Sequence, residues 1–323
     1  MVAAETSIEI CVKGKWVRMP AFNIEGTTLV VTGKWLKFAA IKGEEWQGSE
    51  GMLPPDQLVE HVRRCRPFGA DIFTFSQRSN DPKSRFPYYY ELDSVAVVPI
   101  TTYEEWWTER LGFRARQDVK RAAKLGVVVR VVPFDDELIR GIVGVYNDNP
   151  ARQGERFYHY KRSFEDVKRA HATYLETSEF VGAFLGDELI GYVKIVHGDN
   201  IARLLQITSK VSHQDKRPTN ALLAKAVELS AARGCSHLTY GKYHYAQGAD
   251  SLTAFKHRTG FEEILVPRYY VPLTTTGKLA LKLGLHRGIK AMLPGPVLQF
   301  LKRVRTSVYR LRERISLTSR SSA

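Results

Sequence analysis

FVGAFLGDELIGYVKIVHGDNIARLLQIT, residues 180–208, is the stretch that decides the fold. Three apolar runs within it predict strands, at 180–185, 189–196 and 201–208. The dipeptide Gly186-Asp187 separates the first two runs as in a tight hairpin, and a turn at 197–200 precedes the third. The stretch therefore predicts an antiparallel meander of three strands.

Helices and strands flank the meander on both sides, so the sequence predicts an α+β protein. Before residue 127 the pattern predicts strands at 8–12, 28–31, 72–75 and 95–99, a helix through Leu58, Val59, Val62 and Cys65, and one helix from Tyr103 to Leu125 that Gly126 ends. Between there and the meander it predicts a strand at 127–132, a helix opened by Asp135 and Asp136, and a helix from Ser163 to Thr177. After the meander it predicts a helix at 218–233, a strand at 236–240, a helix at 251–258 and a strand at 264–271.

The order of elements over residues 127–272 resembles that of a GNAT acyltransferase domain. GAFLGDELIGYV (182–193) resembles the hairpin of that fold, and FKHRTGF (255–261), of the form F-x-x-x-x-G-F, resembles its ending. KRAAKLG (120–126), before a Val-rich strand, resembles the junction between the two GNAT-like domains of Fem-type aminoacyltransferases. The resemblance implies a degenerate GNAT-like domain at 1–126, a GNAT-like acyltransferase domain at 127–272 and a basic amphipathic helical tail at 273–323.

The composition agrees with a two-domain cytoplasmic protein. A chain of 323 residues suffices for two domains of ~100–200 residues each. Cys11, Cys65 and Cys235 lie far apart, which predicts neither a zinc site nor a disulfide framework. The start, MVAAETSIEI, lacks the basic flank and apolar run of a signal peptide. We expect no bound metal and no tightly bound cofactor.

The resemblance implies an activated acyl donor as co-substrate. In members that use acetyl-CoA, a loop of the pattern Gln/Arg-x-x-Gly-x-Gly/Ala lets backbone N–H groups approach the pyrophosphate. Here the run is QDKRPTNALL (214–223), with Arg217 and Thr219 where glycines would stand. This departure favours the Fem-type branch, whose donor is carried on tRNA, and acyl-CoA, an acyl carrier protein thioester and aminoacyl-tRNA stay open. Donor contacts are expected from Gln214, Lys216, Arg217, Thr219, Asn220 and Lys256, although an exposed helix face would explain Lys256 equally well.

Acyl transfer needs a group that takes the acceptor's proton and donors that hold the carbonyl oxygen. In the GNAT fold the substrates meet where the third meander strand and the next parallel strand splay apart, which places Leu204–Ser209 opposite Thr239–Tyr245. His244 is the candidate base, because only histidine titrates near neutral pH without a large perturbation. Tyr243 or Tyr245 would act as acid or orienting group. The alternative is that these aromatic residues pack beneath the following helix.

The loop at 149–160 lies where acceptor-binding segments lie in related folds. Its candidate acceptor-binding residues are Arg152, Gln153, Arg156, Tyr158 and His159. Guanidinium and aromatic groups together would suit an anionic or sugar-bearing acceptor. A solvated loop with Pro150 and Gly154 as turn formers is the alternative.

The tail carries ten of the fourteen net positive charges, because residues 273–323 hold eleven Lys or Arg and one acid, Glu313. Apolar residues recur there at three- and four-residue steps from Val297 to Ile315, which predicts a basic amphipathic helix. Such a tail can bind an anionic membrane surface, bind RNA phosphates including those of tRNA, or pack on the body or another copy.

These features predict an acyltransferase that forms an amide or ester on an amine or hydroxyl acceptor. The Fem-type resemblance and the tail favour a cell-envelope or exopolysaccharide precursor as acceptor, and a cytoplasmic enzyme peripheral on the inner face of the membrane. A catalytically idle GNAT-like module that binds RNA or a protein partner is the alternative. The oligomeric state stays open.

Overall fold

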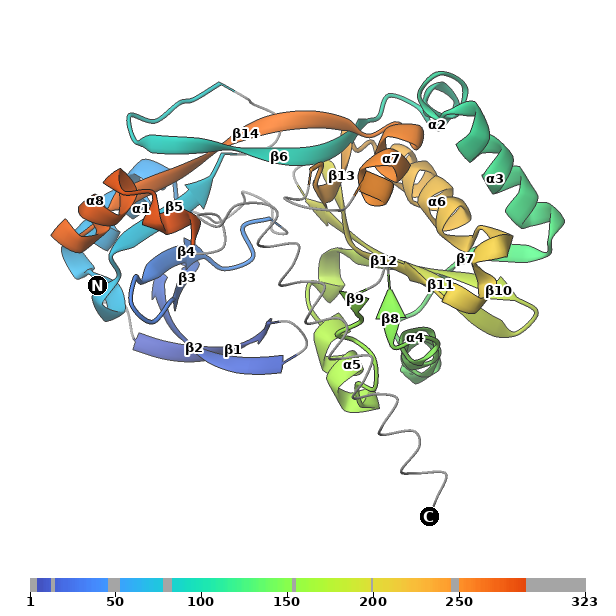
Figure 1. The fold of residues 1–323 in the computed structure, drawn as a ribbon, viewed down its shortest axis with the longest axis horizontal. Coiled ribbons are helices and arrows are strands. Elements are labelled where there is room, and N and C mark those ends of the chain that lie inside the picture. Colours follow the sequence, from blue (N-terminus) through green and yellow to red (C-terminus); the bar gives the residue numbers. More distant parts are fainter. Residues whose placement is uncertain are drawn as a thin grey trace, which may run out of the picture.

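The structure is a computed structural model, which describes residues 5–12, 15–45, 53–77, 83–152, 155–198, 200–244 and 250–288. Its centre is one sheet of twelve strands in the order β1-β2-β3-β4-β5-β14-β6-β13-β12-β11-β10-β7 (Figure 1), and β8 and β9 form a separate pair. The strands are β1 Glu5–Val12, β2 Lys15–Ile24, β3 Thr27–Thr32, β4 Phe38–Ile41, β5 Ile72–Ser76, β6 Tyr89–Pro99, β7 Val127–Val132, β8 Ala151–Arg152, β9 Glu155–Arg156, β10 Ser178–Leu185, β11 Glu188–Gly198, β12 Ile201–Ser209, β13 His237–Lys242 and β14 Glu262–Pro272.

Helices cover the sheet on both faces in the second half of the chain (Figure 1). The α-helices are α1 Pro55–Cys65, α2 Tyr103–Glu105, α3 Phe113–Lys124, α4 Asp136–Asn147, α5 Phe164–His171, α6 Pro218–Ala232, α7 Asp250–Arg258 and α8 Thr275–Lys282. Shorter turns of helix are η1 Pro67–Gly69, η2 Trp106–Arg110, η3 Leu175–Thr177, η4 Val211–Lys216 and η5 Leu285–Arg287.

The predicted meander is confirmed as β10, β11 and β12, which pair antiparallel in sequence order. Val193 of β11 belongs to the core that α6 covers, and its neighbour Tyr192 belongs to the core beneath α4 and α5. Because both faces of β11 are buried, its sequence is a nearly continuous apolar run and does not alternate with polar residues.

Two long strands join the halves of the molecule. β6 precedes the second half in sequence, yet it pairs with β13, and β14 is the last strand of that half, yet it pairs with β5. β6 and β14 also pair with each other from Tyr89↔Tyr270 to Val97↔Glu262. Each half therefore completes its sheet with a strand from the other, and the domain boundaries after residues 126 and 272 stay a proposal.

The single helix predicted from Tyr103 to Leu125 is wrong. The chain forms α2, a π-helical turn (η2) and then α3, with a break at Leu111 and Gly112. The Gly112 N–H donates to the Arg258 carbonyl at the end of α7 over 2.9 Å. A Cβ at Gly112 would lie 2.9 Å from that same oxygen, so the close approach of α7 fixes both the glycine and the break.

The helix predicted from Ser163 to Thr177 ends early, at His171. The buried Lys194 ammonium donates to the His171 carbonyl over 2.8 Å and also to the Thr173 carbonyl. These bonds satisfy carbonyl groups that a longer helix would have used itself.

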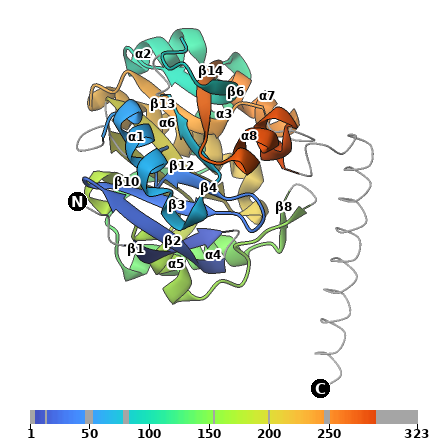
Figure 2. The ribbon, with the colours of Figure 1, turned by 90° about the vertical axis from the view of Figure 1, so that its left-hand side faces the viewer.

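The N-terminal hairpin of β1 and β2 reaches the second half at α5 (Figure 1 and Figure 2). The Trp16 indole donates to Asp166 over 3.2 Å, and the Arg169 guanidinium lies 3.9 Å from the centroid of the Trp16 ring and pairs with Glu9. The sequence prediction missed β2. Most of the predicted tail, residues 289–323, lies outside the described residues.

Candidate active site

The parallel strands β12 and β13 separate where the sequence predicts. They pair only at Ile201↔His237, Ala202↔Leu238 and Arg203↔Thr239. On its other edge β12 carries a bulge, since Lys194 pairs with Gln206 and Ile195 with Leu204 while Leu205 has no partner. A bulge bends its strand and increases the local twist, which opens a gap between β12 and β13.

The corresponding gap in the first half is occupied. β4 and β5 pair in parallel only from Phe38↔Ile72 to Ala40↔Thr74. The Gln77 N–H bonds to β14, so the preceding Ser76 N–H points toward β4, where it donates to the Glu44 carboxylate over 2.5 Å. Arg268 on β14 lies 3.3 Å from the same carboxylate. Burial raises the pKa of Glu44 to about 7.

Ser209, at the end of β12, joins the predicted donor and acceptor segments. The Arg152 guanidinium donates to the Ser209 carbonyl over 2.8 Å. The Ser209 hydroxyl shares a hydrogen bond of 2.8 Å with the Thr219 hydroxyl in the first turn of α6. The structure thus brings one predicted residue of each substrate segment to a single buried serine.

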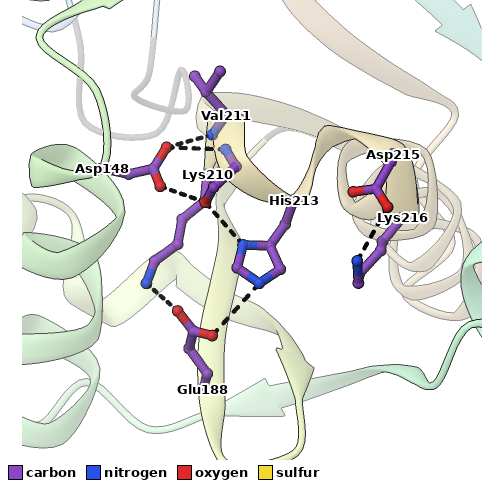
Figure 3. Close-up of polar contacts among 8 residues, drawn as sticks. Asp148, Glu188, Lys210, Val211, His213, Asp215 and Lys216 are labelled. Atoms are coloured by element: carbon purple, nitrogen blue, oxygen red, sulfur yellow. Dashed lines mark hydrogen bonds and ion pairs between the residues drawn. The ribbon is translucent and has the colours of Figure 1, made fainter.

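The loop between β12 and α6 is held at its start by two carboxylates (Figure 3). Asp148 accepts the Val211 N–H over 2.6 Å and the Ser212 hydroxyl over 2.5 Å. Although burial raises the pKa of Asp148, these hydrogen bonds outweigh it and lower the pKa below its usual value. Glu188, on the β10–β11 hairpin, pairs with Lys210 and lies 3.5 Å from His213. The loop is therefore fixed to α4 and to the meander.

The start of α6 keeps the backbone of a glycine turn without the glycine. Arg217 precedes Pro218 in the left-handed conformation, with φ 58°, and no side chain caps the helix. Its guanidinium lies 3.1 Å from Asp118 of α3, and Lys216 lies 3.1 Å from Asp215. Both basic donor-site candidates beside α6 thus have a carboxylate partner.

The remaining predicted donor residues are scattered. Gln214 is exposed, Asn220 is half-buried, and Lys256 is completely buried, so the exposed-face interpretation of Lys256 is wrong. The Lys256 ammonium donates to the Lys242 carbonyl over 2.5 Å and lies 4.7 Å from the centroid of the Tyr240 ring. Burial lowers the pKa of Lys256 to about 8. Lys256 is therefore packed against the end of β13 and does not reach the surface.

The predicted catalytic residues follow β13. Tyr243 is buried in the core shared with α6, and Tyr245 lies outside the described residues. The His244 ring lies 3.5 Å from the Glu263 carboxylate, with more than half of the histidine side chain exposed. Because β6 and β14 lie on the side of β13 opposite β12, His244 points away from the gap in this structure.

The predicted acceptor loop meets the other wall of the gap. The His159 ring stacks on Tyr146 of α4 with centroids 4.5 Å apart, and its Nε2 lies 3.4 Å from the Gln206 amide nitrogen on β12. Burial, followed by the charges of Arg162 and Arg152, lowers the pKa of His159 to about 4. Tyr158 is exposed. Gln153 and the Arg156 side chain lie outside what the structure describes.

A buried polar cluster beside this loop was missed by the sequence analysis. The hydroxyls of Tyr146 and Tyr192 lie 2.6 Å apart, and each lies within 3.2 Å of His171 Nε2. Burial lowers the pKa of His171 to about 3. Lys194, in an otherwise apolar strand, and Gln206 on the next strand were the sequence signals that could have revealed it.

Four nitrogen atoms of this region are buried without a hydrogen-bond partner among the described residues. They are Arg152 Nε, His159 Nδ1, Arg162 Nε and His171 Nδ1. Buried donors are normally satisfied, so such a group indicates bound water or a ligand. Among all the residues that the structure describes, no group of three or more His, Cys, Asp or Glu side chains is arranged to hold a metal ion.

Comparison with known proteins finds likeness in structure alone. No family model and no curated protein matches the sequence. FemX is 11% identical, with 87% of this chain and 90% of that chain covered at a TM-score of 0.57. A DUF2156 domain from Agrobacterium fabrum, assigned as the C-terminal domain of a lysylphosphatidylglycerol synthetase, is 16% identical. It covers 80% of this chain and 84% of its own length at a TM-score of 0.51. L-PGS from Bacillus licheniformis is 14% identical, with 80% of this chain and 86% of that chain covered at a TM-score of 0.50. The expected α+β class is confirmed, and the chain shares its overall fold with FemX.

Proposed function

We propose that the protein transfers an acyl or aminoacyl group from an activated donor to an amine or hydroxyl of an acceptor in the gap between β12 and β13. The observation that carries this proposal is Ser209, which is bonded both to Arg152 of the acceptor loop and to Thr219 at the start of α6. Two segments held to one residue can bring two substrates together, and such positioning supplies a large part of the rate of a bimolecular reaction.

The donor enters on the α6 side. The N-terminus of this helix has no side-chain cap, and a helix N-terminus favours phosphate and carboxylate groups. The left-handed Arg217 preserves the turn that a glycine would make. Acyl-CoA, an acyl carrier protein thioester and aminoacyl-tRNA each carry a phosphate on the group that bears the acyl chain, and contacts to this phosphate are expected from Gln214, Lys216, Arg217, Thr219 and Asn220.

The acceptor lies against the loop that carries Arg152, Gln153, Arg156, Tyr158 and His159. The unpaired buried nitrogens of Arg152, His159 and Arg162 favour an acceptor with anionic or hydroxyl oxygens. Because His159 is neutral at pH 7, it can exchange hydrogen bonds with a sugar or phosphate without adding charge. A cell-envelope or exopolysaccharide precursor made in the cytoplasm has this chemistry.

His244 is proposed as the base that takes the proton of the attacking amine or hydroxyl, with Tyr243 and Tyr245 as orienting groups. Its support is the carboxylate of Glu263, 3.5 Å away, which would stabilise the protonated ring. Direct proton transfer requires the ring to turn toward the gap. The nucleophile then attacks the acyl carbon, and the departing sulfur or ribose oxygen receives a proton.

The names of the structural neighbours support the same reaction class. One neighbour is named for a synthetase of lysylphosphatidylglycerol, which denotes a lysyl group joined to a lipid. This name favours an aminoacyl donor and an acceptor of the cell envelope for the present chain.

A catalytically idle module that binds RNA is the second candidate. The observation in its favour is that both basic residues beside α6 already have carboxylate partners, Asp118 and Asp215. An RNA-binding role would then depend on the basic tail, with affinity that falls steeply with salt.

Calorimetry on the intact protein separates the two candidates. The ligands are acetyl-CoA, longer acyl-CoAs, aminoacylated tRNA, the same tRNA without its amino acid, and an unrelated RNA. Saturable binding of a CoA ester, or of aminoacylated tRNA in preference to the deacylated form, supports the transferase. Equal binding of all RNAs with no binding of CoA esters contradicts it and supports the idle module.

A further inference from the structure

The short helix α8 is attached to the sheet by one face. A Cβ at Gly277 would lie 2.0 Å from the Asp71 carbonyl, so the helix touches the backbone there, and Ala280 is buried. Beyond the helix, His286 packs on Tyr270 with ring centroids 4.9 Å apart and lies 2.7 Å from Glu91. These contacts therefore hold α8 and η5 against the body (Figure 2).

The opposite side of the same segment exposes leucines. The exposed fractions are 57% for Leu279, 56% for Leu283 and 43% for Leu285. A hollow of about 510 Å³ lies between Tyr89 of β6 and the segment from Leu281 to Gly284. Exposed apolar groups of this size, clustered on one short segment, mark an interaction surface more often than isolated ones do.

A tryptophan lies on a segment attached to the same part of the body. Trp35, in the turn between β3 and β4, is 96% exposed. Two residues later the Lys37 N–H donates to Asp71 over 2.9 Å, and the Asp71 carboxylate also accepts the hydroxyl of Thr274, the residue that caps α8. Asp71 thus holds the tryptophan turn and the start of α8 together.

The charge on this surface is positive. Lys278 and Lys282 alternate with the leucines and form no ion pair among the described side chains. The acid beneath them, Glu91, is already paired with His286 and Arg287. The sequence has no Asp or Glu between Glu263 and Glu313. Nothing on the segment would repel a negatively charged surface.

We propose that the α8 face, defined as Trp35, Lys278, Leu279, Lys282, Leu283 and Leu285, docks on an anionic lipid bilayer. Leucines interspersed with lysines suit the boundary between acyl chains and headgroups, where the apolar groups enter and the ammonium groups stay among phosphates. Tryptophan is favoured at the same depth. A protein partner is less well matched, because lysines are depleted from the centres of protein interfaces. None of the described helices is long and apolar enough to cross a bilayer.

The test is sedimentation of the intact protein with vesicles of phosphatidylglycerol and, separately, of phosphatidylcholine. The wild type is expected to bind phosphatidylglycerol more tightly, with affinity that decreases as salt increases. The variant Leu279→Ser, Leu283→Ser, Leu285→Ser keeps every charge and is expected to bind at least tenfold more weakly. Trp35→Ala is expected to weaken binding too, although it lies outside α8.

The matched control is Val128→Ser with Val131→Ser, on the edge strand β7 at the far end of the sheet. These valines are 57% and 46% exposed, so the control removes exposed apolar surface at a different place on the molecule. Unchanged vesicle binding by the triple-serine variant would overturn the proposal. A lower melting temperature of the triple-serine variant would also overturn it, since the chain itself would then cover the face. A wild type that is a dimer and a variant that is a monomer in light scattering would overturn it too, since a second copy would then cover the face.

Discussion

Charged side chains around the gap differ in whether their charge is already compensated. On the donor side, Arg217 and Lys216 each have a carboxylate partner, so a phosphate must compete for them. On the acceptor side, Arg152 donates to backbone carbonyls and Arg162 to the Asp166 carbonyl. A cation that is buried and bonded only to carbonyls gains more from an anionic ligand. The residue-level evidence for an anion is therefore stronger at the acceptor loop.

His244→Ala is expected to lower turnover by ~10²–10⁴-fold while leaving the melting temperature nearly unchanged, because the side chain is exposed and a base acts mainly in the transition state. Glu263→Gln should give a smaller decrease, since it removes only the carboxylate beside the ring. Steady-state kinetics with the donor found by calorimetry measures both. Full activity of the alanine variant would exclude His244 as the base.

Two substitutions of Arg217 separate the role of its backbone from that of its side chain. Arg217→Gly removes the charge and favours the left-handed φ of 58°, whereas Arg217→Ala removes the charge and keeps the strain of about 1 kcal/mol. If the guanidinium contacts the donor phosphate, both variants lose donor affinity in calorimetry, and the glycine variant melts at the higher temperature. Unchanged affinity in both would place the donor away from this helix start.

The buried cluster makes stability depend on pH. The folded protein keeps His171 neutral because burial lowers its pKa to about 3, whereas the unfolded chain binds a proton below about pH 6.5. The free energy of unfolding is therefore expected to decrease as pH falls from 6.5 toward 3. His171→Phe should reduce this slope in urea unfolding at pH 7.5 and pH 5. Equal slopes in the wild type and in this variant would contradict the account.

At the level of elements, the sequence predicted what local patterns determine. The meander, α6 and the F-x-x-x-x-G-F ending have strong periodicity or turn residues, and all are present. The break at Gly112 and the early end of α5 depend on α7 and Lys194, which lie far away in sequence. The same reason explains the site: Ser209 was on the predicted wall, but the cluster of Tyr146, Tyr192 and His171 joins three elements by contacts that no single segment encodes.

Gly260 of the F-x-x-x-x-G-F ending tests the packing between α7 and the π-helical turn. It has φ 82°, and a Cβ would lie 3.1 Å from the Trp106 indole nitrogen. Gly234 has a similar φ of 69° with open space around it. Gly260→Ala should therefore lower the free energy of unfolding by more than Gly234→Ala, which is expected to cost about 1 kcal/mol. Equal losses in denaturant titrations would show that crowding at Trp106 does not matter.

In the whole molecule, two halves of similar architecture share strands but differ at their gaps. Each half has one parallel strand pair with a helix between its strands, β4-α1-β5 and β12-α6-β13. In the first half Glu44 fills the position beside β5, and Arg268 from the shared strand β14 holds it there. In the second half the proposed donor and acceptor segments meet at Ser209 instead. We therefore propose that acyl transfer takes place in the second gap and not in the first.

Hydrogen–deuterium exchange of the intact protein, with and without acetyl-CoA or aminoacyl-tRNA, tests this assignment most directly. The ligand that binds is expected to slow exchange of backbone amides in residues 204–209 and 217–221 and to leave residues 72–76 unchanged. Those two segments line the second gap and begin α6, whereas the Ser76 amide is already bonded to Glu44. Protection at 72–76, or binding without any protection at 204–209 and 217–221, would contradict the account.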